Sequence, residues 1–122
     1  MTKILLVEDD RIVSRLIENL LQRKGYSIST LADGRSASAF INSNSETPDL
    51  VLLDLMLPFI DGFEILNLMR ANPTWQNVPV IMLTSKGQEK NIVRAFELGA
   101  NDYILKPFNR EEVAIRIKRQ LK

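Results

Sequence analysis

The sequence predicts an α/β fold, a doubly wound, five-stranded parallel sheet with a helix after each strand. Short apolar runs alternate five times with amphipathic stretches, and that alternation is typical of βα units around a sheet buried on both faces. The length of 122 residues suits one compact domain. A composition of 45% hydrophobic and 25% charged residues is that of an ordinary globular protein. We therefore expect a single domain over residues 1–122.

The expected strands are the five apolar runs. They cover residues 3–7, 26–31, 50–53, 78–83 and 102–105. Serine and threonine residues make the second run polar on one side, which an edge strand tolerates. The other runs are apolar enough to lie between two layers of helices.

Two helices are expected before the third strand. The first has its apolar positions at helical spacing over residues 13–21, and Gly25 stands where a C-terminal cap belongs. The second follows Asp33 and is marked by apolar residues within 37–41. The polar stretch 42–48 then predicts a loop that ends this helix.

Three further helices complete the pattern. Residues 62–71 form the third, which Asp61 can cap at its N-terminus. Apolar residues at positions 92, 95 and 96 mark the fourth, and Gly99 closes it. The fifth begins after Asn109, with an acid three residues later in the spacing of a capping box.

Composition and charge exclude several classes of function. The chain has no cysteine and no histidine, which excludes disulfides, thiolate metal sites, thiol catalysis and imidazole bases. A net charge of +1 gives no overall reason to bind nucleic acid or an anionic membrane. No apolar run approaches the roughly 18 residues of a membrane-spanning helix, and the N-terminus is too short and acidic for a signal peptide. We expect a cytoplasmic protein.

Four carboxylates follow two of the expected strands. Glu8, Asp9 and Asp10 follow the first strand, and Asp54 follows the third. Such acids often cap the next helix. Asp54, however, stands directly behind a fully apolar strand, so a cation is expected beside it. Oxygen ligands of this kind favour Mg²⁺, which is typically held by one or two carboxylates and phosphate oxygens.

Hydroxyl and ammonium groups follow the last two strands. Thr84 and Ser85 come at the end of the fourth strand, and Lys106 follows the fifth. Each residue taken singly is equally well explained as a turn or surface residue. Because ligands of doubly wound sheets bind outside the carboxyl ends of the strands, we expect these groups to face a phosphate together with the acids.

Four segments in register resemble the response-regulator receiver domains, a family typified by the chemotaxis regulator and the N-terminal domains of winged-helix transcription factors. They are ILLVEDD at 4–10, DLVLLDLMLPFIDGFE at 49–64, VPVIMLTS at 78–85 and GANDYILKPF at 99–108. The resemblance covers essentially the whole chain. It implies a flavodoxin-like (βα)5 receiver fold with strand order 2-1-3-4-5.

The resemblance also implies a role for each site residue. Asp54 is the phosphoacceptor, and Thr84 and Lys106 complete the catalytic group. Mg²⁺, for which Mn²⁺ can substitute, is held by Glu8, Asp9, Asp54 and a backbone carbonyl; that carbonyl belongs to Met56. Asp10 lies outside this set and is more easily explained as a helix cap.

Switching in this family couples a hydroxyl to an aromatic residue. Here the resemblance assigns that pair to Thr84 and Tyr103, although an aromatic residue in a short strand is most often simply core. Met56, Ser85 and Lys86 would flank the phosphoryl group and tune its lifetime. The bond between residues 106 and 107 is expected to be cis, an isomer that X-Pro bonds tolerate.

The implied function is a phosphorylation-dependent switch of a two-component system rather than a turnover enzyme. Its expected partner is a sensor histidine kinase or a histidine phosphotransfer protein. Glu97, Asp102, Arg116 and Lys118 fit the pattern of a dimer face made by the fourth helix, the fifth strand and the fifth helix, although they are also explained as solvated charges. Basic residues within 110–122 are diluted by acids, so no direct contact with nucleic acid is expected.

Three other functions share this fold. A flavodoxin-like binder of a phosphorylated cofactor should present glycines and hydroxyls in its first loop, where this chain has acids. An aspartate-dependent phosphatase of one large superfamily needs a second acid where Met56 stands. A pseudo-receiver, used only as an interaction module, usually loses the acceptor or the acids, and this chain keeps them.

Overall fold

The computed structural model describes residues 1–43 and 46–121. Residues 44 and 45 of the predicted loop 42–48, and Lys122 at the end of the basic stretch, lie outside the described residues. The rest of that loop is irregular, as predicted.

Within the described residues, five parallel strands form one sheet in the order β2-β1-β3-β4-β5, which confirms the predicted topology. They are β1 (Lys3–Val7), β2 (Ser27–Leu31), β3 (Leu50–Leu53), β4 (Val80–Thr84) and β5 (Asp102–Leu105). The polar strand β2 lies at an edge, as its sequence predicts. Three strands have the predicted bounds.

Two strands differ from their predicted bounds. β2 begins at Ser27 instead of residue 26, and β4 covers Val80–Thr84 instead of 78–83. The predicted start of β4 includes Pro79, which has no N–H to donate to a ladder. The carbonyl of Pro79 accepts from the N–H of Val51 (2.9 Å), and the regular pairing of β4 begins only with the next residue.

Five helices follow the strands in the described residues. They are α1 (Arg11–Arg23), α2 (Gly34–Ile41), α3 (Gly62–Ala71), α4 (Glu89–Glu97) and α5 (Arg110–Gln120). The carboxylates of Asp10, Asp33 and Asp61 accept backbone N–H groups in the first turns of α1, α2 and α3, which satisfies donors that a helix leaves unpaired. Asn109 caps α5 in the same way.

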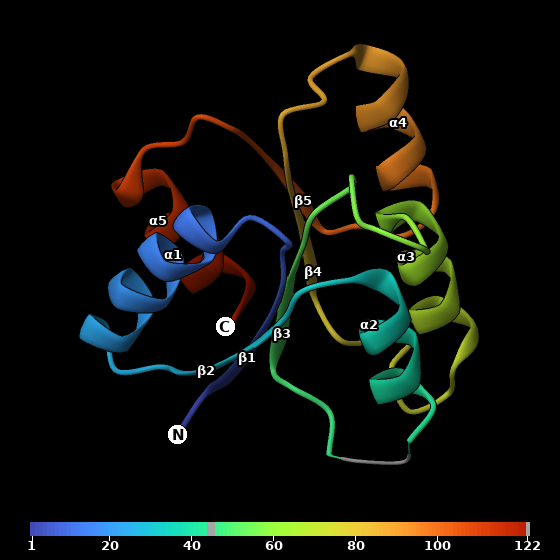
Figure 1. Cartoon of the computed structure of the whole chain (residues 1–122), viewed down its shortest axis with the longest axis horizontal. Helices are drawn as coiled ribbons and strands as arrows, with labels where there is room; N and C mark the ends of the chain where they lie inside the picture. Colours follow the sequence, from blue (N-terminus) through green and yellow to red (C-terminus); the bar gives the residue numbers. More distant parts are fainter. Residues whose placement is uncertain (44–45, 122) are drawn as a thin grey trace.

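The helices lie in two layers, with α1 and α5 on one face of the sheet and α2, α3 and α4 on the other (Figure 1). Each face has its own buried apolar cluster. Alternate residues of β3 divide between them, because Leu50 and Leu52 belong to the cluster under α1 and α5 while Val51 and Leu53 belong to the other. None of the helices in the described ranges combines the length and apolar composition that a bilayer crossing needs.

The turn between β3 and α3 brings the start of the helix against the end of the strand. The N–H of Gly62 donates to the carbonyl of Leu55 at 2.9 Å. A Cβ atom at position 62 would lie 2.4 Å from the carbonyl oxygen of Asp54 and 2.7 Å from the Cα of Leu55. Glycine is therefore required here for close approach of two backbone segments.

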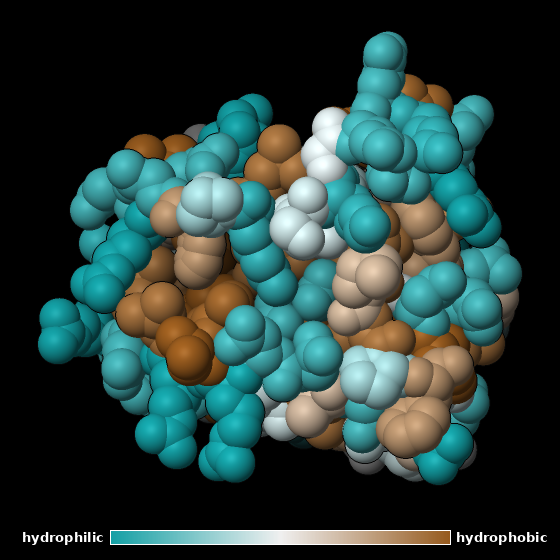
Figure 2. Space-filling model, turned by 45° about the horizontal axis from the view of Figure 1, so that its top comes forward, coloured by the Kyte–Doolittle hydropathy of each residue, from teal (hydrophilic) through white to brown (hydrophobic). Residues whose placement is uncertain are grey.

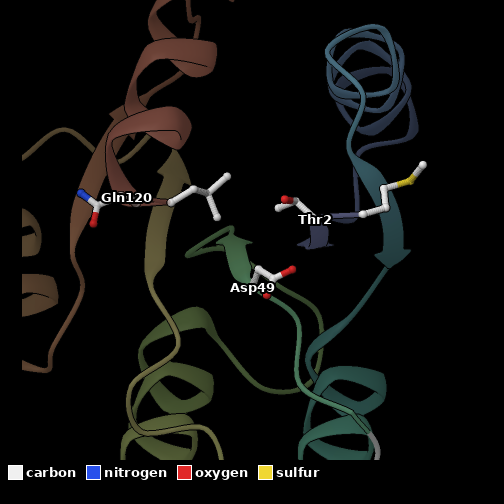
Figure 3. Close-up of a pocket in the computed structure, with 5 residues that line it drawn as sticks. Thr2, Asp49 and Gln120 are labelled. Carbon is white, nitrogen blue, oxygen red and sulfur yellow. The ribbon is translucent and has the colours of Figure 1, made fainter.

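A cavity of about 570 Å³ opens at the amino ends of the strands (Figure 3). It is lined by Met1, Thr2, Asp49, Gln120 and Leu121. The carboxylates that follow β1 and β3 lie at the opposite ends of those strands, where ligands of doubly wound sheets are usually found. This cavity is therefore separate from the candidate site.

Candidate functional site

Three carboxylates gather at the carboxyl end of the sheet. Oxygens of Glu8, Asp9 and Asp54 all lie within 4.8 Å of one another. Glu8 and Asp54 are buried, whereas Asp9 is exposed. This set of hard oxygen donors fits the predicted divalent cation. Asp10 turns away from the cluster to cap α1, in agreement with its interpretation as a cap.

Lys106 joins two of the acids. Its Nζ lies 2.5 Å from Oε1 of Glu8 and 3.2 Å from Oδ2 of Asp54. The other Glu8 oxygen accepts the backbone N–H of Asp10 at 3.1 Å. The positive charge expected beside Asp54 therefore comes in part from Lys106, which reaches the acids from the end of β5.

Burial shifts the acid–base properties of this group. It raises the pKa of Glu8 to about 7, with the charge of Asp54 acting in the same direction and the contact with Lys106 acting against it. Burial alone would lower the pKa of Lys106, but the carboxylates of Glu8 and Asp54 hold it above its ordinary value. Removing Glu8 from water therefore costs free energy that the lysine only partly offsets.

Glu8→Gln is expected to stabilise the metal-free protein at pH 8 by about 1–3 kcal/mol relative to wild type, and by much less at pH 5. The folded-state pKa of Glu8 lies above its ordinary value of 4.5. Between these two values the folded state holds more protons than the unfolded state, so the stability of the wild type falls as pH rises. Urea unfolding in EDTA at several pH values measures this difference. A stability difference that does not change between pH 5 and 8 would contradict the prediction.

Asp54 is oriented by the turn that follows β3. Its backbone N–H donates to the carbonyl of Val7 (2.9 Å), and its Oδ1 accepts the N–H of Met56 at 3.1 Å. Oδ2 faces Lys106. The side chain of Met56 is 55% exposed, so it borders the site from the solvent side.

The backbone of Lys86 links Thr84 to Tyr103. Its N–H donates to Oγ1 of Thr84 at 3.2 Å, and its carbonyl accepts the hydroxyl of Tyr103. Thr84 is fully buried at the end of β4, and Tyr103 is 9% exposed with its ring in the core on the α2–α4 face. Burial and the charge of Asp54 both raise the pKa of Tyr103, so its hydroxyl stays a donor at neutral pH.

The remaining predicted residues border the site. Ser85 and the side chain of Lys86 are exposed at the start of the β4–α4 connection. The bond between Lys106 and Pro107 is cis, as predicted. Apart from Tyr103, which lies within β5, the predicted site residues therefore belong to the carboxyl end of the sheet or to the loops that follow it.

Some of the charges predicted for a dimer face have partners within the chain. Arg116 on α5 pairs with Asp102 at the start of β5 (2.9 Å) and with Glu112 one turn earlier (3.2 Å). Asp102 and Arg116 therefore have partners within the chain, and the dimer face stays a prediction. Phe96, one of the apolar residues that mark the fourth helix, is 45% exposed, whereas Ala95 is buried.

An apolar groove beside Lys106 was missed by the sequence analysis. It has a volume of about 410 Å³ and lies between α1 and the connection from β5 to α5. Its apolar lining is Val13, Leu16, Ile17, Leu20, Pro107 and Phe108. Figure 2 shows apolar side chains gathered on the α1 and α5 side, with polar side chains around them. Leu16, one of the apolar residues at helical spacing within 13–21, is 42% exposed and borders this groove.

Comparison with known proteins places this site in context. Residues 4–118 match the family model of the response regulator receiver domain. The chain is 42% identical over 120 residues to the regulatory protein VanRc of Enterococcus gallinarum, an alignment that covers 98% of this chain and 50% of that protein. The chain thus spans about half the length of the curated relatives it matches.

Solved structures agree with this match. A putative response regulator from Chloroflexus aurantiacus superposes with a TM-score of 0.90 at 36% identity, over 98% of this chain and 97% of that one. The receiver domain of the sensor histidine kinase PA1611 of Pseudomonas aeruginosa PAO1 superposes with a TM-score of 0.88 at 32% identity, over the same shares of the two chains. That structure has a magnesium ion coordinated in its active-site cleft.

Proposed function

This chain belongs to the response regulator receiver domain family of two-component signalling, and from that premise we propose that residues 1–122 act as a cytoplasmic phosphorylation switch with Asp54 as phosphoacceptor. One observation carries the proposal. The Nζ of Lys106 lies 3.2 Å from Oδ2 of Asp54, inside a cluster of acids that also contains Glu8 and Asp9. The arrangement presents a nucleophilic oxygen next to fixed positive charge.

The acid cluster is the proposed site for Mg²⁺, with Mn²⁺ as a substitute. Glu8, Asp9 and Asp54 would supply carboxylate oxygens, and Met56 would supply its backbone carbonyl. When bound, the ion supplies Lewis-acid neutralisation of charge on phosphoryl oxygens. The oxygen-only donor set, and the magnesium coordinated in the related PA1611 domain, support this proposal.

In the proposed reaction the carboxylate of Asp54 attacks the phosphorus of a phosphohistidine. An O–P bond forms, the P–N bond breaks, and the imidazole of the donor leaves. Lys106 neutralises charge on the transferred group, and the hydroxyl of Thr84 donates to one of its oxygens. Phosphoryl transfer depends mainly on positioning and charge, so a histidine-free chain can perform it.

Thr84 and Tyr103 are the proposed switch pair. Because Oγ1 of Thr84 accepts the N–H of Lys86, a hydroxyl that turns to a phosphoryl group releases that N–H. The carbonyl of the same residue accepts the hydroxyl of Tyr103, so the change reaches β5. Met56, Ser85 and Lys86 border the site and are proposed to control how fast water reaches the phosphoryl group.

The proposed partner is a histidine kinase or a histidine phosphotransfer protein. The apolar groove beside Lys106 supports a protein donor, because an apolar helix face of such a partner could lie there next to the acceptor. A phosphorylation-dependent homodimer through α4, β5 and α5 remains a proposal. We also propose that this domain is not a turnover enzyme and does not contact nucleic acid directly.

Incubation with acetyl phosphate tests the proposed chemistry. Intact mass is expected to show a gain of one phosphoryl group that requires Mg²⁺ and is absent in Asp54→Asn. Asp49→Asn is the matched control. Asp49 lies just before β3, whereas Asp54 lies just after it, so this variant should be phosphorylated like the wild type. No adduct in the wild type would favour a pseudo-receiver that acts only as an interaction module.

A further inference from the structure

Arg70, in the last turn of α3, donates hydrogen bonds to carbonyl groups of two loops. Its Nη1 donates to the carbonyls of Val78 (2.8 Å), Gln76 (3.1 Å) and Trp75 (3.4 Å), all between α3 and β4. Its Nε and Nη2 donate to the carbonyl of Gly99 at 3.1 and 2.8 Å. A guanidinium with its donors in a fixed fork suits such a set of carbonyls.

The Gly99 carbonyl belongs to the turn that ends α4. Gly99 has φ +107°, and a Cβ atom there would lie 2.9 Å from Nε of Arg70. Nη2 of Arg70 also donates to Oδ1 of Asn101 at 3.0 Å, and the same oxygen accepts the N–H of Val80 at 2.9 Å. The C-terminal end of α4 is therefore tied to α3 and to the starts of β4 and β5.

The N-terminal end of α4 has fewer contacts with the rest of the described chain than its C-terminal end. Gln88 makes no side-chain cap bond, and residues 85–90 are all exposed. Within α4 the buried residue is Ala95, in the C-terminal half. In Figure 1, α4 begins at the top of the view, beyond the sheet, and runs down towards α3. The loop that leads into this free end contains Lys86, whose N–H donates to Thr84 and whose carbonyl accepts the hydroxyl of Tyr103.

We propose that Arg70 is a positioning residue that pins the C-terminal end of α4, so that phosphorylation moves the N-terminal half of the helix about its Gly99 end. The inference rests on the proposed function for its trigger, the release of the Lys86 N–H from Thr84. The guanidinium donates to carbonyls of the α3–β4 loop and of Gly99, which follows α4. Its positive charge is also favourable at the C-terminus of α4. Because the Gly99 end of α4 is held in place, a change in the loop between β4 and α4 moves only the N-terminal half of the helix.

Hydrogen exchange of the full chain, with and without acetyl phosphate and Mg²⁺, tests this inference. In the wild type, phosphorylation is expected to raise exchange over residues 86–92 and to leave residues 97–101 unchanged. Arg70→Met is expected to raise exchange over 97–101 roughly ten-fold or more in both states. Phosphorylation should then alter exchange along the whole of α4. Arg119→Met, on an exposed position of α5, is the matched control and should behave as wild type.

Intact mass measured in parallel separates the two proposals. If the wild type forms no phosphoryl adduct, the proposed function is overturned. The exchange over residues 97–101 reports separately on whether Arg70 holds the C-terminal end of α4. Arg70→Met should take up the phosphoryl group within about two-fold of the wild-type rate, because Arg70 contacts none of the site residues. Equal exchange changes at both ends of α4 in the wild type would overturn the inference. So would unchanged exchange over 97–101 in Arg70→Met or, should that variant not fold, in Arg70→Lys.

Discussion

Replacing Lys106 by methionine is expected to slow phosphorylation by acetyl phosphate by roughly 10²- to 10³-fold. The ammonium group lies 3.2 Å from Oδ2 of Asp54, where the proposed reaction uses it to neutralise charge on the incoming phosphoryl group. Methionine keeps the length of the side chain but removes the charge and every donor. Intact mass followed over time in Mg²⁺ measures the rate.

The matched control is Lys90→Met, which removes an exposed lysine from α4. It should leave the rate within about two-fold, because Lys90 is exposed and salt weakens the interactions of exposed charges. A Lys106→Met variant that reacts as fast as Lys90→Met would remove the lysine from the proposed chemistry. The unfolding free energies of both variants, measured alongside, show whether a lower rate comes from loss of the fold.

Gly62→Ala is expected to lower the free energy of unfolding by about 3 kcal/mol or more. The new methyl group would lie 2.4 Å from the carbonyl oxygen of Asp54 and 2.7 Å from the Cα of Leu55. Both are backbone atoms, which no rotamer change can move away. Because the carbonyl oxygen belongs to Asp54, the proposed phosphoacceptor, the variant should also react more slowly with acetyl phosphate. Urea unfolding and the time course of intact mass measure the two effects.

Gly25→Ala separates crowding from backbone strain. Gly25 has φ +90° and nothing within 4 Å of a built Cβ atom, so alanine there costs only the left-handed conformation, about 1–2 kcal/mol. The variant should phosphorylate normally. Equal losses of stability in the two variants would mean that the turn before α3 relaxes and that the close approach at Gly62 is unimportant.

The sequence predicted the convergence at the carboxyl end of the sheet because strand order and side-chain alternation determine which residues meet there. Glu8, Asp9 and Asp54 follow neighbouring strands, so they lie together once β1 pairs with β3. Asp10 could be separated from them in advance, because a cap position follows from the start of a helix. The match of several motifs in register then indicated the family.

Other features depend on contacts that no local pattern contains. Arg70 appeared as one more charged residue of α3, because its carbonyl partners come from two loops whose shapes arise only on folding. The pairing of Arg116 with Asp102 likewise depends on how α5 lies against β5. Leu16 shows a third limit. Helical spacing places it near the apolar side of α1, but only the packed neighbours determine that it borders a groove.

The division of the apolar residues into two clusters, one on each face of the sheet, has a consequence for how this sequence can vary. The buried side chains under α1 and α5 form one cluster, those under α2, α3 and α4 form the other, and the sheet lies between them. Substitutions in opposite layers should therefore be thermodynamically additive. Evolution can repack the layer beneath α1 and α5 without compensating changes beneath α4, so the proposed partner surface on that side can diverge while the layer beneath α4 is retained.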